Sequence, residues 1–337
     1  MIARRSAHFL SWLVWLLAMG ATSCVVNPVP TPAAGGTTSL AADATSGGAT
    51  DNGSQDDATA SAKDTAYVPD ATAVESFVPA TATQAGVSGI FGDHVAIYEP
   101  GVPSSGKLVV LLPNRDLQPK DYTQILRIAA QRGHRVLGLA YPSTNAAQVC
   151  KIDGNCYEYL HHETLDGQDH SDKVVVGYNN CIEQRLAFAL QWLVNYRPGQ
   201  GWGSYVSGNT PLWQSIIIVG DGEGAGQAGF IGKVRSVARV VLLQGPLDST
   251  PQGPAAWIAS SAQTPASAWY GLADNTSSDF STISANWLAI GLGSSQSPVS
   301  TLGAFGSAHG LVTDGPLTPA SVDDPDLKPA WWYLFTP

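Results

Sequence analysis

Positive charge is scarce in this sequence. Its 337 residues include 17 Lys or Arg and 27 Asp or Glu, so the formal net charge is −10. A protein that binds nucleic acid needs a basic face to neutralise the phosphates. We therefore expect no nucleic-acid partner.

Cysteine is also scarce, with four residues in the chain. None forms a CxxC pair, and no spacing matches a known metal-ligand motif, so we expect no metal and no cofactor. Cys150 and Cys156 flank the turn-like "KIDGN" and are the favoured disulfide pair. The sequence leaves open whether Cys181 is free or replaces one of them.

Long apolar runs are limited to one near the start. After the basic "MIARR" comes "FLSWLVWLLAMGA", which has the length of a signal peptide and is too short for a comfortable membrane span. The following "ATSC" ends at Cys24 and resembles the lipobox of bacterial lipoproteins. This resemblance implies a leader over residues 1–23, a lipidated Cys24, and an exported protein anchored in the bacterial cell envelope. The alternative is an ordinary signal peptide cleaved nearby.

Large apolar side chains are almost absent from the segment that follows. Residues 25–83 are mostly Ala, Thr, Ser, Gly and Asp. Such a segment cannot bury enough surface to offset the entropy lost on ordering. We expect a flexible tether over residues 24–84 and one folded domain over residues 85–337.

The folded domain alternates apolar runs with helical patterns. The runs read as buried strands and the patterns as helices with one apolar face. Strands that are apolar on both faces predict a mostly parallel sheet with helices on both sides, whose chemistry gathers at the carboxyl ends of the strands. The strands expected are "KLVVLLP", "HRVLGLAYP", "WQSIIIVG" and "VARVVLLQG", with "ASAWYGLA" and "WLAIGL" less certain.

A glycine-rich turn, "GDGEGA" at residues 220–225, joins the third strand to a helix. It fits the G-x-G-x-x-G/A pattern of dinucleotide-binding folds, but the next strand ends at Gln244, where an acidic residue would bind ribose. It also fits the nucleophile elbow of α/β-hydrolases, small-x-nucleophile-x-small. In that frame the outer glycines match and the nucleophile position is Gly222, so the elbow reading is favoured over a nucleotide-binding oxidoreductase.

The wider chain resembles a group of exported bacterial α/β-hydrolase-like proteins over roughly residues 105–315, where relatives carry an elbow such as "GHSQGAGHA". The matching stretches are "KLVVLLP", "GHRVLGLAYPS", "NCIEQRLAFALQWL", "GWGSY", "SIIIVGDGEGAGQAGFIGKVRSVARVVLLQGPLD", "ASAWYGL" and "GSAHGLVTD". The resemblance implies the α/β-hydrolase fold and places Gly222 where relatives have their serine.

The same resemblance implies the other catalytic positions. His309 matches the catalytic histidine in the loop after the last strand. The acid would be Asp274, or Asp279 as the next candidate, with Asp248 a less favoured substitute after an earlier strand. Without a hydroxyl at Gly222, no acyl-enzyme can form.

The region that would bind an oxyanion also departs from the family. Relatives have a glycine-containing loop after "LLP", whose backbone N–H groups join that of the residue after the nucleophile, here Glu223. In this chain the loop is "NRDLQP", with Asn114 and Arg115 in place of glycines. We expect poor stabilisation of an oxyanion, although Arg115 offers a positive charge.

One further cluster carries metal-ligand side chains. The segment "YEYLHHETLDGQDH" contains His161, His162, Glu163, Asp166, Asp169 and His170. Because its spacing matches no known ligand pattern, we expect a solvated loop.

The predicted function is that of a degenerate serine hydrolase, inactive or nearly so. It would bind an unknown small molecule or protein in the cell envelope, attached to the membrane by its lipid. The competing hypothesis is an active carboxyl-ester hydrolase with a non-standard arrangement around His309.

Overall fold

The structure is a computed structural model that describes residues 72–298 and 309–336. These residues belong to one compact unit that extends from Ala66 to Pro337. Among the described residues, no helix has the length and apolar character needed to cross a membrane. The predicted leader and Cys24 lie outside the described residues.

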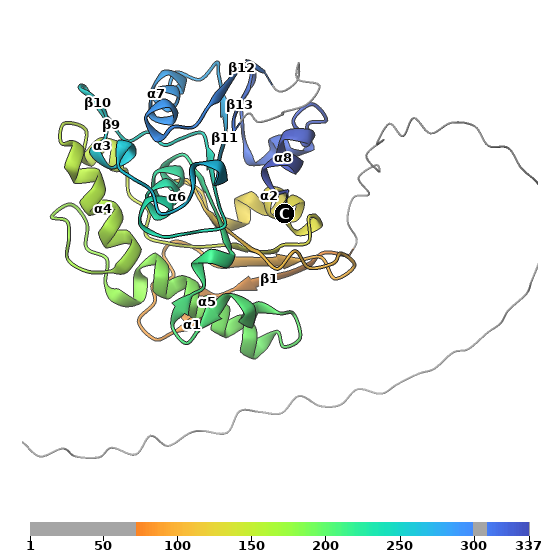
Figure 1. Ribbon diagram of the computed structural model, residues 1–337. Helices are drawn as coiled ribbons and strands as arrows, with labels where there is room; N and C mark the ends of the chain where they lie inside the picture. Colours follow the sequence, from red (N-terminus) through yellow and green to blue (C-terminus); the bar gives the residue numbers. More distant parts are fainter. Residues whose placement is uncertain (1–71, 299–308, 337) are drawn as a thin grey trace, which may run out of the picture. The chain divides into compact units, whose positions relative to one another are not determined.

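A sheet forms the centre of this unit (Figure 1). It has nine strands in the order β1-β2-β4-β3-β7-β8-β11-β13-β12. Strand β2 is antiparallel to both of its neighbours, and the remaining pairs are parallel. The strands are β1 (Val74–Val78), β2 (His94–Tyr98), β3 (Leu108–Leu112), β4 (Arg135–Gly138), β7 (Ile216–Asp221), β8 (Arg239–Leu243), β11 (Trp269–Asp274), β12 (Ser294–Pro298) and β13 (Gly310–Thr313).

The helices cover both faces of the sheet. They are α1 (Ala80–Thr83), α2 (Thr123–Gln131), α3 (Ala146–Val149), α4 (Gly154–Asp166), α5 (Ile182–Tyr196), α6 (Glu223–Val234), α7 (Phe280–Ile290) and α8 (Lys328–Leu334). Two short hairpins, β5 (Val206–Ser207) with β6 (Thr210–Pro211) and β9 (Ser249–Thr250) with β10 (Gly253–Pro254), lie outside the main sheet.

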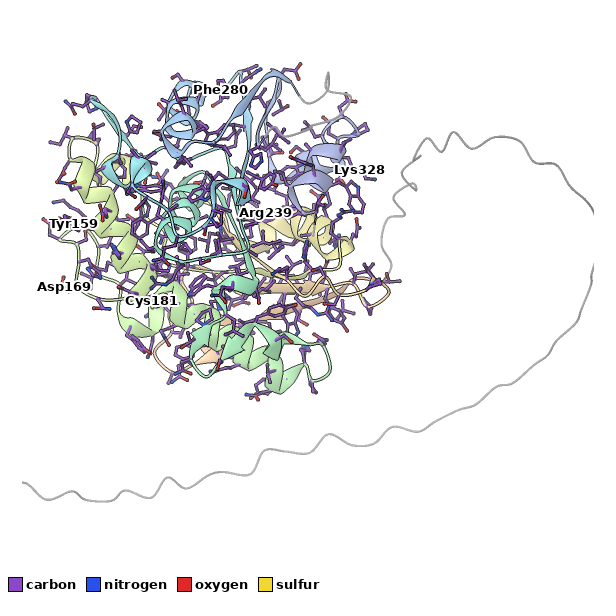
Figure 2. All side chains as sticks on the ribbon, viewed as in Figure 1. Tyr159, Asp169, Cys181, Arg239, Phe280 and Lys328 are labelled. Atoms are coloured by element: carbon purple, nitrogen blue, oxygen red, sulfur yellow. A yellow bond between two sulfur atoms is a disulfide. The ribbon has the colours of Figure 1, made fainter. Side chains whose placement is uncertain are left out.

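Alternating strand residues divide the core into two layers, which side chains fill (Figure 2). Val110 and Ile218 belong to a cluster with residues of α4, α5, α6 and α7. Val109 and Ile217 belong to a second cluster with residues of α2 and α8. Successive strand side chains point to opposite faces, so an unbroken apolar run is required where both faces are buried.

These features are those of the α/β-hydrolase fold, as the sequence predicted. The sheet is mostly parallel, helices cover both faces, and a sharp glycine turn joins β7 to α6. The carboxyl ends of the parallel strands meet at one edge of the sheet, where a site is expected.

Three predictions about the elements are wrong. The folded part begins before residue 85, because β1 at Val74–Val78 pairs with β2, so the tether cannot extend to residue 84. The segment "WLAIGL" lies largely in α7, whose Trp287 fills the space above Gly271, where an added Cβ would be 2.5 Å from the indole. The segment "YEYLHHETLDGQDH", expected to be a solvated loop, lies largely in the 13-residue helix α4. Short apolar runs fit either a strand or a buried helix, which explains the error at α7.

Candidate functional site

The turn between β7 and α6 has the backbone of a nucleophile elbow. Gly222 stands at its apex with φ 54° and ψ −113°, a conformation that strains any residue with a side chain. A Cβ on Gly220 would lie 2.0 Å from the carbonyl oxygen of Gly224, and one on Gly224 would lie 2.2 Å from that of Leu112. The flanking positions therefore require glycine, as the elbow pattern predicts.

The side chain of Asn114 lies where a side chain at position 222 would begin. A Cβ added to Gly222 would be 2.6 Å from Cγ and Nδ2 of this asparagine. Oδ1 of Asn114 accepts hydrogen bonds from the backbone N–H of Arg115 at 2.8 Å and of Glu223 at 3.3 Å. In α/β-hydrolases the oxyanion hole uses the N–H of the residue after the nucleophile, which is the position of Glu223, and an N–H from the loop after β3, where Arg115 lies. The structure thus brings together all three residues predicted for this region, with the amide oxygen of Asn114 at the N–H groups.

Asn114 is held in place by hydrogen bonds that run through Tyr122 to Asp221. Its backbone N–H donates to the hydroxyl oxygen of Tyr122 at 3.0 Å, and the Tyr122 hydroxyl donates to Asp221 at 2.6 Å. Burial raises the pKa of Asp221 to about 6, although the hydrogen bond from Tyr122 opposes the rise. Burial and the nearby Asp221 also raise the pKa of Tyr122, so this phenol stays a donor.

A cavity of about 310 Å³ lies over the elbow, at the carboxyl ends of the strands. One part of its wall is apolar, and the other carries carboxyl, amide and hydroxyl groups. None of the described residues that line it is a histidine or a cysteine. They are Asn114, Leu117, Asp221, Gly222, Gln244, Leu247, Ser277, Asp279, Ile283, Leu317, Thr318 and Pro319.

The two predicted acid candidates have different surroundings. Asp279 lines the cavity together with Gly222. Asp274 is the last residue of β11, and its Oδ1 accepts hydrogen bonds from the backbone N–H of Thr276 at 2.8 Å and from the hydroxyl of Thr276 at 2.7 Å. Of the two, Asp279 is the carboxyl that can meet a ligand in the cavity.

His309 lies elsewhere. It precedes β13, its Nδ1 is 2.8 Å from the carbonyl oxygen of Trp269, and its ring stacks on Tyr270 with centroids 4.6 Å apart. The prediction that it lies after the last strand is wrong. Because β13 is parallel to β11, His309 lies at the amino ends of the strands, whereas Gly222 follows the carboxyl end of β7. The run "GLV" in "SAHGLVTD" is too short to be identified as a strand from sequence.

A buried network that the sequence did not predict lies beside the elbow. His161 of α4 places Nε2 2.6 Å from Oδ2 of Asp248 and Nδ1 2.8 Å from Oε1 of Gln227. The indole N–H of Trp257 donates to the same Asp248 oxygen at 2.8 Å. His161 and Asp248 are buried at 2% and 1% exposure, which strengthens their electrostatic attraction. Burial lowers the pKa of His161, but the charge of Asp248 and its hydrogen bond outweigh this and raise it overall.

Glu223 connects this network to the elbow. It shares a small cavity of about 10 Å³ with His161 and Gln227, and its Oε2 accepts from the backbone N–H of Ala146 at 3.2 Å. Burial and the charge of Asp248 raise the pKa of Glu223 to about 7, while the charge of His161 opposes the rise. No local motif could have revealed this group, since its partners are 66 and 87 residues apart.

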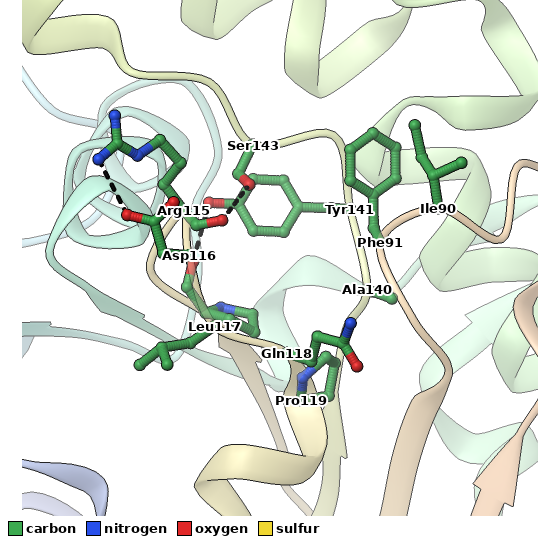
Figure 3. Close-up of a pocket in the computed structure, with 11 residues that line it drawn as sticks. Ile90, Phe91, Arg115, Asp116, Leu117, Gln118, Pro119, Ala140, Tyr141 and Ser143 are labelled. Carbon is green, nitrogen blue, oxygen red and sulfur yellow. Dashed lines mark hydrogen bonds and ion pairs between the residues drawn. The ribbon is translucent and has the colours of Figure 1, made fainter.

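The loop after β3 borders a second cavity, of about 130 Å³, on the side of Phe91 and Tyr141 (Figure 3). The guanidinium of Arg115 forms an exposed ion pair with Asp116 at 2.9 Å. The positive charge that the sequence offered for an anion is therefore already paired.

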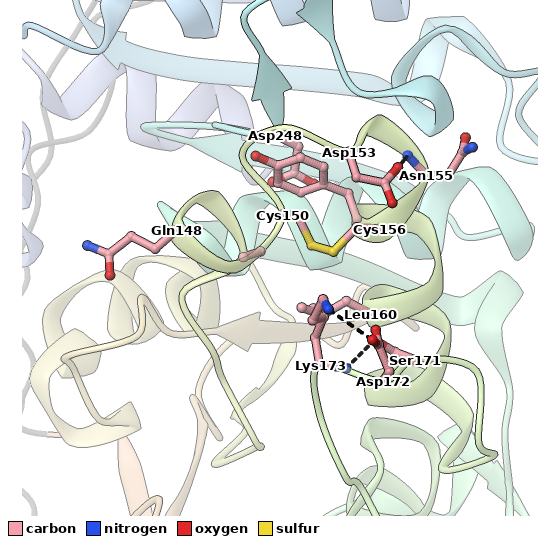
Figure 4. Close-up of a disulfide and its surroundings, with 12 residues drawn as sticks. Gln148, Cys150, Asp153, Asn155, Cys156, Leu160, Ser171, Asp172, Lys173 and Asp248 are labelled. Carbon is pink, nitrogen blue, oxygen red and sulfur yellow. Dashed lines mark hydrogen bonds and ion pairs between the residues drawn. A yellow bond between two sulfur atoms is a disulfide. The ribbon is translucent and has the colours of Figure 1, made fainter.

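Two cysteine predictions are settled by the structure. Cys150 and Cys156 form a disulfide with their Cα atoms 5.3 Å apart, which joins the residue after α3 to the first turn of α4 (Figure 4). Cys181 is free and buried.

One group of described side chains with metal-ligand chemistry lies away from the cavity, at the end of α4. It consists of His162, Asp166 and His170. The expectation of a solvated loop is wrong here, because α4 includes the first two of these residues.

Comparisons with known proteins found matches among solved structures. No protein-family model and no curated protein matches the sequence. A mutant of the esterase E40 is similar over 79% of this chain and 84% of its own, with 15% identity and a TM-score of 0.42. A predicted CIB-like hydrolase from Thermoplasma acidophilum is similar over 79% of this chain and 99% of its own, with 10% identity and a TM-score of 0.37. The strand order and the backbone of the elbow are what identify the fold of this chain.

Proposed function

We propose that this protein is a degenerate α/β-hydrolase that binds a small ligand in the cavity above Gly222 without forming an acyl-enzyme. The observation that carries the proposal is the position of Asn114. Its amide oxygen lies at the N–H groups of Arg115 and Glu223, where the carbonyl oxygen of an ester would have to bind.

Three requirements of acyl transfer are not met at this site, which supports the proposal that the protein forms no acyl-enzyme. The elbow has no nucleophile, because its apex is Gly222. No described residue lining the cavity is a histidine that could act as base. The oxyanion donors are engaged by a side chain of the protein itself. An enzyme that has lost its triad keeps some rate through its oxyanion hole, and here that hole is filled.

The cavity favours a ligand with mixed character. Leu247, Ile283 and Leu317 supply apolar contacts, while Asp221 and Asp279 supply acceptors. A small molecule with an apolar part and hydroxyl or amine donors fits this chemistry. At about 310 Å³, the cavity lies at the lower end of the range for small-molecule sites.

The test measures binding with 4-phenylbutylamine, which has an apolar part and an amine donor, and turnover with 4-nitrophenyl butyrate. Wild-type protein should show saturation-transfer NMR signals for the amine, no release of nitrophenol from the ester above the buffer rate, and no labelling by a serine-reactive phosphonate. Leu247→Trp fills the cavity and should abolish the transfer signals. Leu288→Trp changes a leucine that is 81% exposed and should leave them intact. Enzymatic turnover by the wild type would refute the inactive reading and favour an active ester hydrolase.

The cellular setting is proposed from the leader. The lipobox-like "ATSC" supports acylation of Cys24 and anchoring in a bacterial cell envelope. The disulfide between Cys150 and Cys156 suits an oxidising compartment. Mass spectrometry of the mature protein should find its N-terminus at a lipid-modified Cys24, and an unmodified mature chain beginning elsewhere would contradict the anchor.

A further inference from the structure

The end of α4 and the loop after it bring two histidines and a carboxylate together. His162 and Asp166 are four residues apart on α4, so they share one face of the helix. Nε2 of His170 lies 3.0 Å from Oδ2 of Asp166, and the rings of His162 and His170 have centroids 5.0 Å apart. One ligand atom from each of the three residues lies within 4.8 Å of the others.

The fold holds this arrangement in place from beneath. The buried carboxylate of Glu163 accepts hydrogen bonds from the backbone N–H of His170 at 3.3 Å, Ser171 at 2.9 Å and Val176 at 2.9 Å. These bonds turn the loop back over the helix. On the helix side, the ring of His162 packs edge-on against Phe230, with centroids 4.7 Å apart. The backbone of His170 and the ring of His162 are therefore positioned by contacts other than those with Asp166.

The donor set has the chemistry of a zinc site. Two imidazoles and one carboxylate leave a fourth tetrahedral position for water, and tetrahedral ligands at about 2.0–2.1 Å from zinc are about 3.3 Å apart. The present separations, up to 4.8 Å, need only a modest closing movement of side chains. The site also lies at the carboxyl end of α4, where the helix dipole favours a cation.

We infer that His162, Asp166 and His170 bind a divalent transition-metal ion of the Zn²⁺ class. The ion replaces the direct contact between His170 and Asp166 and ties the loop to the end of α4. This site is separate from the proposed ligand cavity, since none of the three residues lines it.

The test is titration of the full-length protein, freed of any affinity tag, with ZnCl₂ in a calorimeter. Wild type should bind one ion at this site with micromolar or tighter affinity, and Co²⁺ should give the visible absorption of a tetrahedral site. His170→Ala should weaken zinc binding at least about 10-fold, because even partners outside the ligand shell typically contribute that much. Zinc should raise the melting temperature of wild type and not that of His170→Ala.

The matched control is Asp169→Asn, which removes an exposed carboxylate next to His170 and should bind zinc as wild type does (Figure 2). His170 is exposed, so its replacement should leave the fold intact, which circular dichroism can verify. Failure of wild type to bind zinc would overturn the inference. Equally tight binding by His170→Ala would overturn it too, because the metal would then lie elsewhere.

Discussion

Gly222→Ser would introduce a hydroxyl at the apex of the elbow, yet we expect it to leave the protein without esterase activity. The new Oγ would need a base within hydrogen-bond reach and an open oxyanion hole. None of the described residues that line the cavity is a histidine, His309 lies at the amino ends of the strands, and Asn114 Oδ1 already accepts from the N–H groups of Arg115 and Glu223.

The same substitution should also reduce stability. A Cβ at Gly222 would lie 2.6 Å from Asn114 Cγ, so the asparagine must move and lose its bonds to Arg115 and Glu223. Each lost hydrogen bond costs roughly 0.5–1.5 kcal/mol. A side chain at φ 54° and ψ −113° adds a strain of about 1–3 kcal/mol. The free energy of unfolding should therefore fall by about 2–6 kcal/mol, as measured by urea denaturation.

A double variant separates the clash from the backbone strain. Asn114→Gly in the Gly222→Ser background removes the side chain that the new Cβ would meet and frees both N–H groups. Its free energy of unfolding should stay close to that of Gly222→Ser alone, because both variants lack the two hydrogen bonds to Asn114 and both carry the backbone strain at residue 222. It should still turn over ester poorly, because a serine without a base remains a weak nucleophile.

The assay is release of nitrophenol from 4-nitrophenyl acetate, with phosphonate labelling in parallel. Wild type, Gly222→Ser and the double variant are each measured with and without His309→Ala. If Gly222→Ser turns over ester and His309→Ala abolishes that turnover, His309 reaches the elbow. The position of His309 before β13 would then be wrong, and so would our account of the site.

Three further predictions follow from the same contacts. In the folded protein the pKa of Glu223 is about 7, whereas in the unfolded chain it is about 4.5, so the free energy of unfolding falls as pH rises between these values. Glu223→Gln should remove this part of the fall, as measured by urea titrations across that pH range. An unchanged pH profile would contradict the burial of this carboxyl. Gly224→Ala should lower the free energy of unfolding by about 3 kcal/mol or more, because the added Cβ would lie 2.2 Å from the carbonyl oxygen of Leu112. The control is Gly177→Ala, whose Cβ would have no neighbour within 4 Å and which should change stability by less than about 1 kcal/mol. Replacing Cys150 and Cys156 together by alanine should lower the free energy of unfolding by about 2 kcal/mol, and an equal loss should follow reduction of the wild type.

Local pattern was sufficient for the central strands and for the elbow. Strands β3, β4, β7 and β8 are apolar on both faces, so their runs are unbroken and easy to identify. Gly220 and Gly224 are required by backbone contacts within the turn and its neighbour β3, which is why the spacing alone identified the elbow. The pairing of Cys150 with Cys156 was equally local, at a separation of six residues.

Pattern failed where an element is short or where its partner is distant. Strand β13 has four residues, and without it His309 was placed at the wrong end of the sheet. Strand β1 is defined by its pairing with β2, which no local sequence pattern indicates, so the predicted tether extends too far along the chain.

The sequence by itself determined the fold class, the lack of a side chain at the elbow apex Gly222 and the local disulfide. Each was inferred from a local feature: the strand and helix patterns, the glycine spacing, and two cysteines close together in the chain. Only the tertiary structure decided that Asn114 lies where a side chain at position 222 would begin, that His161 pairs with Asp248, and that His309 lies away from the elbow. These facts depend on side chains from strands and helices that are distant in sequence. The contacts between these side chains are fixed by how the helices pack against the sheet, and the spacing of residues along the chain does not predict them.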